Sequence, residues 1–121
     1  MKIELIQTDH TVIANIIADE KVIVSYQDAL DLMANCQYQG TSKIILDKKN
    51  IVDEFFDLKT GIAGEILQKF SNYKCQLAIV GDFSKFQSKS LRDFIYESNK
   101  MGQIFFVSSF DEAKDCLSRR N

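Results

Sequence analysis

The chain has 121 residues, and its 15 basic and 17 acidic side chains leave a net charge of −2. That length is typical of one domain, and an apolar content of 45% with 26% charged residues argues against intrinsic disorder. A charge this close to zero gives no electrostatic reason to bind nucleic acid. We therefore expect one folded domain over residues 1–121 and no nucleic-acid partner.

The spacing of the cysteines and the length of the apolar runs indicate the cellular compartment of the protein. Cys36, Cys75 and Cys116 lie far apart and form no CxxC or CxxH pair, so we expect free thiols, no metal site and a reducing cytoplasm. No apolar run approaches the roughly 20 residues of a membrane span. The N-terminal segment turns polar at Gln7, without the apolar centre of a signal peptide. We predict a cytoplasmic protein with no membrane segment and no cofactor.

The first third of the chain predicts a hairpin followed by a helix. Residues 3–7 and the β-branched run 11–18 are typical of two antiparallel strands joined by a turn. A further short strand is predicted over residues 22–24. Ser25 then begins a helix, and Asp28 stands where it can complete a capping box.

The rest of the chain alternates between strands and helices. Short apolar runs predict strands over residues 43–47, 76–80 and 104–107. Apolar residues at helical spacing predict helices from about Leu58 or Gly61 to Asn72, from Ser90 to Asn99, and from Ser109 onward. Strands that alternate with such helices lie parallel and are joined by right-handed crossovers. We therefore predict an α/β fold, a mixed sheet of about five or six strands with an N-terminal antiparallel hairpin and parallel βα units.

A strand ending in Asp47 precedes the segment Phe55–Ile62, and a strand ending in Gly81 and a final helix with Glu112 follow. This order resembles the STAS or SpoIIAA-like domain of anti-sigma factor antagonists. In that family an Asp-Ser-Ser-Gly-Leu segment opens a helix and carries a phosphorylatable serine. The resemblance implies a SpoIIAA-like fold for most of the chain.

Three longer segments carry a closer resemblance: Phe55–Phe70, Leu77–Ser84 and Leu91–Asn99. They are similar to a family of small uncharacterised bacterial proteins catalogued as a domain of unknown function. No activity is established for that family, so this resemblance implies none.

The first candidate site is Asp57-Leu58-Lys59-Thr60-Gly61. Aligning Gly61 with the glycine of the antagonist family places Thr60 at the phosphoacceptor position. Lys59 replaces the first serine, and one extra residue separates the aspartate from the glycine. A helix N-terminus accommodates a phosphate, and a phosphothreonine would add about −1.5 to −2 charges to the surface. The alternative is that Thr60 or Asp57 only caps the helix.

The second candidate site lies after two neighbouring strands. Ligands bind beyond the carboxyl ends of parallel strands, where Asp47 and the loop Asp82-Phe83-Ser84 are expected. Lys48, Lys49, Asn50 and Thr60 are expected on the same rim. Two carboxylates with a lysine there can hold a divalent cation. The alternative is that Asp82 makes a turn and Asp47 accepts loop amides. The chain contains no GxGxxG, GxxxxGK[ST] or GxSxG motif, which removes the usual support for nucleotide binding or hydrolysis.

Three further segments each have two interpretations. Phe83 and Phe86 either form an exposed docking patch or pack beneath the next helix. Residues 97–99 either face a partner or form a solvated helix end. Residues 103–107 are either a sheet edge that pairs with another chain or a strand covered by the final helix, so a homo-oligomer stays open.

We expect a non-enzymatic regulatory or protein-interaction module, because no catalytic motif is recognisable in the chain. Its partner would be another protein, and phosphorylation of Thr60 would switch the contact. The alternative is a protein that binds a small molecule or a metal, or an enzyme, using the rim at the strand ends. Both uses draw on one set of residues: Asp47, Asp57, Lys59, Gly61, Asp82, Phe83 and Ser84.

Overall fold

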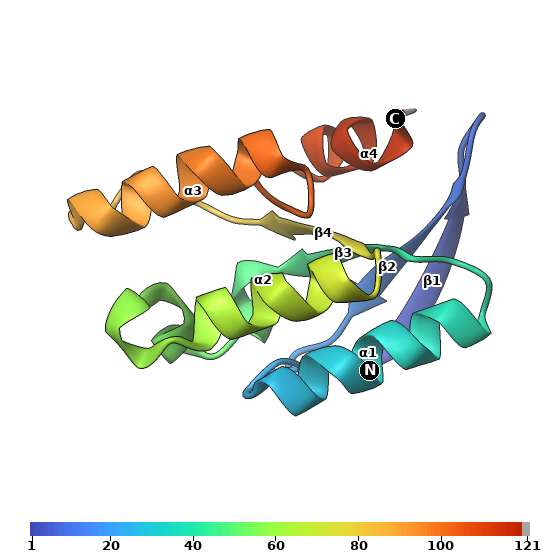
Figure 1. The fold of residues 1–121 in the computed structure, drawn as a ribbon. Helices are drawn as coiled ribbons and strands as arrows, with labels where there is room; N and C mark the ends of the chain where they lie inside the picture. The colour runs from blue at the N-terminus through green and yellow to red at the C-terminus, as the bar shows by residue number, and fades with distance from the viewer. Residues whose placement is uncertain (120–121) are drawn as a thin grey trace.

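The computed structural model describes residues 1–119, which form a five-stranded sheet in the order β1-β2-β3-β4-β5 (Figure 1). The strands β1 (Lys2–Gln7) and β2 (Val12–Ile17) form an antiparallel hairpin. The strands β3 (Lys43–Asp47), β4 (Gln76–Val80) and β5 (Ile104–Val107) continue the sheet in parallel. The predicted α/β fold with a mixed sheet is confirmed.

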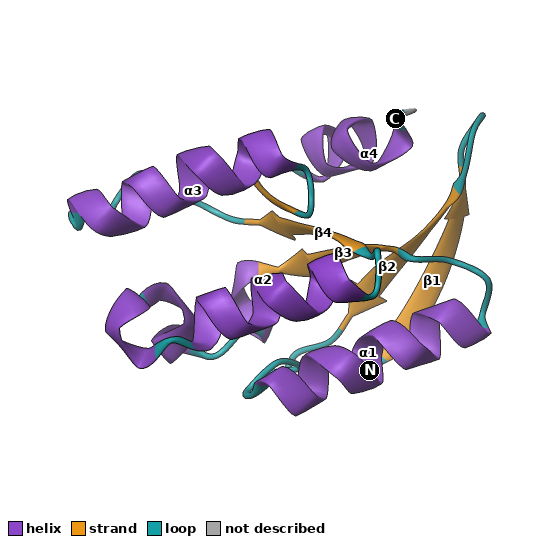
Figure 2. Cartoon of the chain, in the orientation of Figure 1, coloured by secondary structure: helices purple, strands orange, loops and turns teal. Residues whose placement is uncertain are grey.

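Each parallel connection contains a helix, as Figure 2 shows by colour. The helix α1 (Tyr26–Tyr38) links β2 to β3, and α2 (Ile62–Asn72) links β3 to β4. The helix α3 (Lys89–Met101) links β4 to β5, and α4 (Phe110–Ser118) follows β5. Their positions agree with the predicted helices, although α3 begins one residue earlier because the Ser88 hydroxyl caps it.

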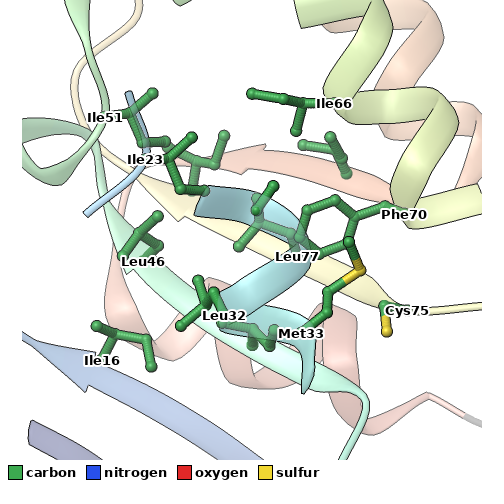
Figure 3. Close-up of a cluster of buried hydrophobic side chains, with 14 of the residues drawn as sticks. Ile16, Ile23, Leu32, Met33, Leu46, Ile51, Ile66, Phe70, Cys75 and Leu77 are labelled. Carbon is green, nitrogen blue, oxygen red and sulfur yellow. The ribbon is translucent and has the colours of Figure 1, made fainter. Parts of the chain in front are cut away.

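The sheet separates two apolar clusters, because successive side chains of a strand point to opposite faces. Ile44 and Leu46 of β3 lie in the cluster that α1, α2 and α3 cover. Ile45 lies in the other cluster, against Ala113 and Leu117 of α4. Figure 3 draws part of the first cluster, with side chains of α1, α2 and β4. Burial of β3, β4 and β5 on both faces explains their continuous apolar sequences.

The predicted strand over residues 22–24 is wrong. Ile23 forms only an isolated parallel bridge with Ile51. Its amide donates to the carbonyl of Asn50 at 3.1 Å, and its carbonyl accepts from the amide of Val52 at 2.9 Å. The sheet position next to β2 is already occupied by β3, so this apolar segment pairs with the turn that follows β3.

The capping residues of two helices are confirmed. The Asp28 carboxylate accepts a hydrogen bond from the Ser25 amide at 3.3 Å, at the start of α1. The Ser109 hydroxyl accepts one from the Glu112 amide at 3.1 Å, at the start of α4. These contacts satisfy backbone groups that have no partner inside the helix, which is why the sequence located both helix starts.

Side chains of α3 occupy the outer edge of β5. The Ser98 hydroxyl, in a side chain that is 1% exposed, donates to the Ile104 carbonyl at 2.7 Å. The Asn99 amide group accepts from the Phe106 N–H at 2.7 Å and donates to the Phe106 carbonyl at 3.3 Å. Glu97 and Asn99 are exposed, as the solvated interpretation of residues 97–99 expects. The hydrogen bonds of Ser98 and Asn99 to β5 were in neither interpretation. They also mean that α3, rather than the final helix, satisfies the edge of β5.

Cys36, Cys75 and Cys116 are free thiols, as predicted. Burial, with a smaller contribution from Cys75, raises the pKa of Cys36 from 9.0 to about 11. The folded state therefore holds this proton more tightly than the unfolded chain does. The resulting stabilisation is fully present below the unfolded pKa of 9.0 and is lost as the pH rises through about 11.

A Cys36→Ala variant tests this pH dependence. The variant is less stable at neutral pH because the substitution leaves a cavity. The original chain then loses the contribution of Cys36 as the pH rises, so the stability difference between the two proteins should shrink towards alkaline pH. This difference is measured by urea unfolding of both proteins at a series of pH values up to the raised pKa of Cys36. A difference that stays constant over this range would contradict the assignment.

Candidate functional site

The candidate site lies in the connection between β3 and α2, beyond the carboxyl ends of β3 and β4 (Figure 1). Three 3₁₀ turns make up this connection: η1 (Lys48–Asn50), η2 (Asp53–Phe56) and η3 (Leu58–Thr60). These turns leave Asp53, Glu54 and Lys59 exposed, and they bury the ring of Phe55 and the side chain of Asn50. The segment predicted to open a helix at Leu58 is thus a 3₁₀ turn, and α2 itself begins at Ile62.

Thr60 lies exposed at the start of α2, with its hydroxyl held by the backbone. The hydroxyl oxygen lies 2.8 Å from the carbonyl of Glu54 and 2.8 Å from the carbonyl of Asp57, and it donates its single proton to this pair. It also accepts a hydrogen bond from the Ile62 amide at 3.2 Å. Thr60 therefore ties η2 and η3 to the first turn of α2.

The neighbours of Thr60 also shape this turn. The Asp57 carboxylate accepts from the Lys59 amide at 3.2 Å and so begins η3. Gly61 has a φ of 78°, a left-handed conformation that glycine adopts without the strain of a side chain. Asp57, Lys59 and Gly61 are all exposed. The segment therefore presents one anionic, one cationic and one hydroxyl side chain to solvent.

Asp82 and Ser84 form a local turn after β4. The Asp82 carboxylate accepts from the Ser84 hydroxyl at 2.6 Å and from the Ser84 amide at 3.0 Å. These hydrogen bonds lower the pKa of Asp82, so it is a carboxylate at neutral pH. This is the turn-forming arrangement that the sequence allowed as the alternative to a ligand site.

Asp47 lies at the same end of the sheet as Asp82 but lines a different groove. Asp47 pairs with Val80 in the parallel register, two residues before Asp82, and its carboxylate accepts from the Lys49 amide at 2.9 Å. It lines a groove of about 220 Å³ with Ile17 and Phe110. Asp82 lines another of about 380 Å³ with Phe83, Ser84 and Glu112. The two carboxylates therefore share a rim without converging on a common groove.

No metal-binding cluster is evident between residues 1 and 119. The structure gathers no three His, Cys, Asp or Glu side chains there into a group that could hold a metal ion. A divalent cation prefers several oxygen ligands. The second candidate site thus has no geometric support as a cation site in this part of the chain.

Lys48 lies on the rim, where the sequence placed it, but its contacts were not predicted. A Cβ atom at Gly81 would lie 2.7 Å from the Cβ of Lys48, so only glycine allows this approach of β4 to η1. The Lys48 ammonium lies 5.6 Å from the centre of the Phe56 ring and 5.2 Å from that of Phe86, within cation–π range. The glycine at the end of β4 was the available signal, but its partner is distant in sequence.

Phe83 and Phe86 pack inward and do not form an exposed patch. Both are half-buried. The ring of Phe86 stacks on Phe56 with centroids 5.3 Å apart, and the ring of Phe83 meets the edge of Phe106 at 5.3 Å. These aromatic contacts link the loop after β4 to η2. The loop that carries Asp82 and the segment that carries Thr60 are therefore joined through one cluster of rings.

Comparisons with known proteins give one family and one structure. The family model described as Domain of unknown function (DUF4180) matches residues 8–117. A crystal structure of a Thermotoga maritima protein proposed to be an anti-sigma factor antagonist is similar at 15% sequence identity and a TM-score of 0.48, over 97% of this chain and 95% of that chain. A search of the curated proteins finds no match. Among residues 1–119, no helix has the length and apolar character needed to cross a bilayer.

Proposed function

This chain belongs to the family described as Domain of unknown function (DUF4180), and we propose that it is a non-enzymatic regulatory module that binds another protein. The partner surface is the exposed start of α2 with the turns before it. The observation that carries the proposal is the position of Thr60, an exposed hydroxyl whose hydrogen bonds hold three consecutive backbone segments together.

Phosphorylation of Thr60 is the switch in this proposal. The threonine oxygen attacks the γ-phosphorus of ATP held by a partner kinase, and the bond from that phosphorus to the oxygen it shares with the β-phosphate breaks. ADP departs, and a basic group of the kinase takes the hydroxyl proton. The esterified oxygen then has no proton to donate to the carbonyls of Glu54 and Asp57. The phosphate remains close to the Ile62 amide at the positive end of α2.

Two changes at the partner surface follow from this modification. The added charge of about −1.5 to −2 lies beside Asp57, which increases the negative potential of the surface. The turns η2 and η3 lose the hydrogen bond that Thr60 donates to them. Phosphorylation therefore alters both the charge and the shape that a partner meets.

Intact-mass analysis tests the switch. After co-expression with the kinases of the source organism, we expect a mass increase of about 80 Da, the mass of one phosphoryl group, that peptide mapping assigns to Thr60. The Thr60→Val variant keeps the shape of the side chain without the hydroxyl, so the increase should vanish. Thr60→Ser should retain it. An unmodified chain, or an increase that persists in Thr60→Val, would contradict this assignment.

A charge reversal tests the partner surface independently of phosphorylation. Lys59 lies on the proposed surface, whereas Lys114 lies on α4. We expect a partner protein cross-linked to the original chain to be lost with Lys59→Glu and retained with Lys114→Glu, because both variants carry the same net charge. Equal loss or equal retention in the two variants would speak against this surface.

A further inference from the structure

The two edges of the sheet differ in their hydrogen bonding. On the outer edge of β5, the carbonyl of Ile104 accepts from Ser98, and both backbone groups of Phe106 are bonded to Asn99. The other edge is β1, whose one strand partner within the described residues is β2. An uncovered sheet edge is a template for strand pairing. The two edges therefore predict different behaviour, closed at β5 and open at β1.

The alternation of hydrogen-bonded pairs in the hairpin identifies which backbone N–H and C=O groups of β1 point away from β2. The Thr8 amide donates to the Thr11 carbonyl at 2.8 Å, so these two residues form a hydrogen-bonded pair at the turn. Such pairs occur at alternate positions of an antiparallel ladder. Lys2, Glu4 and Ile6 thus bond to β2, and the N–H and C=O groups of Ile3 and Leu5 point to the open edge.

The side chains of the open strand alternate between apolar and charged. Met1 is 57% exposed and Leu5 is 46% exposed, on the same face as Ile3. Lys2 and Glu4 are exposed on the opposite face. The strand therefore carries outward backbone groups, exposed apolar side chains and one charged side chain of each sign, and the Met1 ammonium beside it lies 3.6 Å from the Glu20 carboxylate.

We propose that β1 pairs with the β1 strand of a second copy of this chain, antiparallel about a two-fold axis at Ile3. In this register Lys2 lies opposite Glu4 of the copy, and Glu4 opposite its Lys2. Met1 lies opposite Leu5, and Ile3 opposite Ile3. Opposite charges across a strand pair stabilise it, and like charges destabilise it. A shift that centres the axis on Glu4 places two carboxylates opposite each other, so the charges favour the first register over that one.

The pairing is isologous and continues the two sheets into one. It leaves the start of α2 free, because that segment lies beyond the carboxyl ends of β3 and β4 and not at the β1 edge. The contact involves few residues on each copy, and small interfaces bind weakly. The dimer is therefore expected at high protein concentration, and its failure would leave the proposed partner surface unaffected.

Sedimentation equilibrium up to about 1 mM protein, at low salt to limit screening, tests the proposal. We expect a reversible monomer–dimer equilibrium. Lys2→Glu and Glu4→Lys should each raise the dimer dissociation constant roughly tenfold, since each places like charges together at two symmetric positions. The double variant Lys2→Glu/Glu4→Lys should restore the original value. Lys114→Glu, with the same charge change on α4, should leave it unaltered.

Each deviation from this pattern overturns the proposal. A chain that stays monomeric at about 1 mM has no such interface at any useful affinity. A dimer unaffected by both single reversals does not pair through β1, and one that the double reversal fails to restore does not use this register. Leu5→Pro gives a second readout, because the N–H it removes points away from β2. It should abolish the dimer while the circular dichroism of the monomer is kept.

Discussion

Replacing Phe55 by alanine is expected to lower the free energy of unfolding by about 3–5 kcal/mol, the range for a buried aromatic side chain. Phe55 is 1% exposed although it lies in the short turn η2. Its ring lies 5.0 Å from that of Phe56 and 6.3 Å from that of Phe106, measured between centroids. With Ile51, which is also fully buried, it fixes the connection carrying Thr60 to the apolar core. Urea unfolding followed by circular dichroism measures the change.

Two variants control for this effect. Phe55→Leu retains much of the apolar volume and should cost less than Phe55→Ala. Phe110→Ala removes the same ring from a residue that is 38% exposed, so it should cost far less. Similar losses for Phe55→Ala and Phe110→Ala would mean that η2 is not fixed by burial of Phe55.

The second large effect is expected for Asn99→Ala, with a loss of about 1–3 kcal/mol of stability because buried backbone groups lose their partner. The substitution removes both hydrogen bonds to Phe106. It also opens the outer edge of β5 to pairing. We expect a lower urea midpoint, and light scattering should show association beyond that of the original chain at equal concentration.

Asn35→Ala is the matched control, since Asn35 is an exposed asparagine on α1 that lies near Met1, at the other side of the sheet from β5. It should leave both the unfolding midpoint and the association state nearly unchanged. If Asn99→Ala behaves like Asn35→Ala, the side chain of Asn99 does not protect the edge of β5.

The strands of the parallel part were predictable because their signal is local. The run 43–47 is apolar over its middle three residues and is followed by charged ones, and the structure places β3 at the same bounds. The apolar runs 76–80 and 104–107 likewise form strands, β4 and β5, with the predicted bounds. A strand buried on both faces needs apolar side chains at consecutive positions, so the pattern itself identifies it.

The run 22–24 has the same local pattern and does not join the sheet. Its three β-branched residues favour a strand, but the position beside β2 is occupied by β3. Competition between segments for one sheet edge depends on the whole topology. Local propensity for strands is a weak guide in such cases, because the packing context determines the outcome.

The candidate site was predicted in its location and not in its contacts. The sequence placed Thr60 at a helix start and Asp47 and Asp82 at strand ends, and the parallel register brings these two aspartates to one end of the sheet. It could not show that the Thr60 hydroxyl lies 2.8 Å from the carbonyl of Glu54. Such contacts depend on how the 3₁₀ turns fold back, which no periodicity in the sequence encodes.

The sequence by itself determined the α/β class, the parallel strands and the caps of α1 and α4, because each depends on residues within a few positions of one another. Only the tertiary structure decided the closure of β5 by Asn99, the approach of Lys48 to Gly81, and the assignment of Asp47 and Asp82 to separate grooves. These features join residues distant in the chain, and their positions are set by helix and sheet packing rather than by local preference.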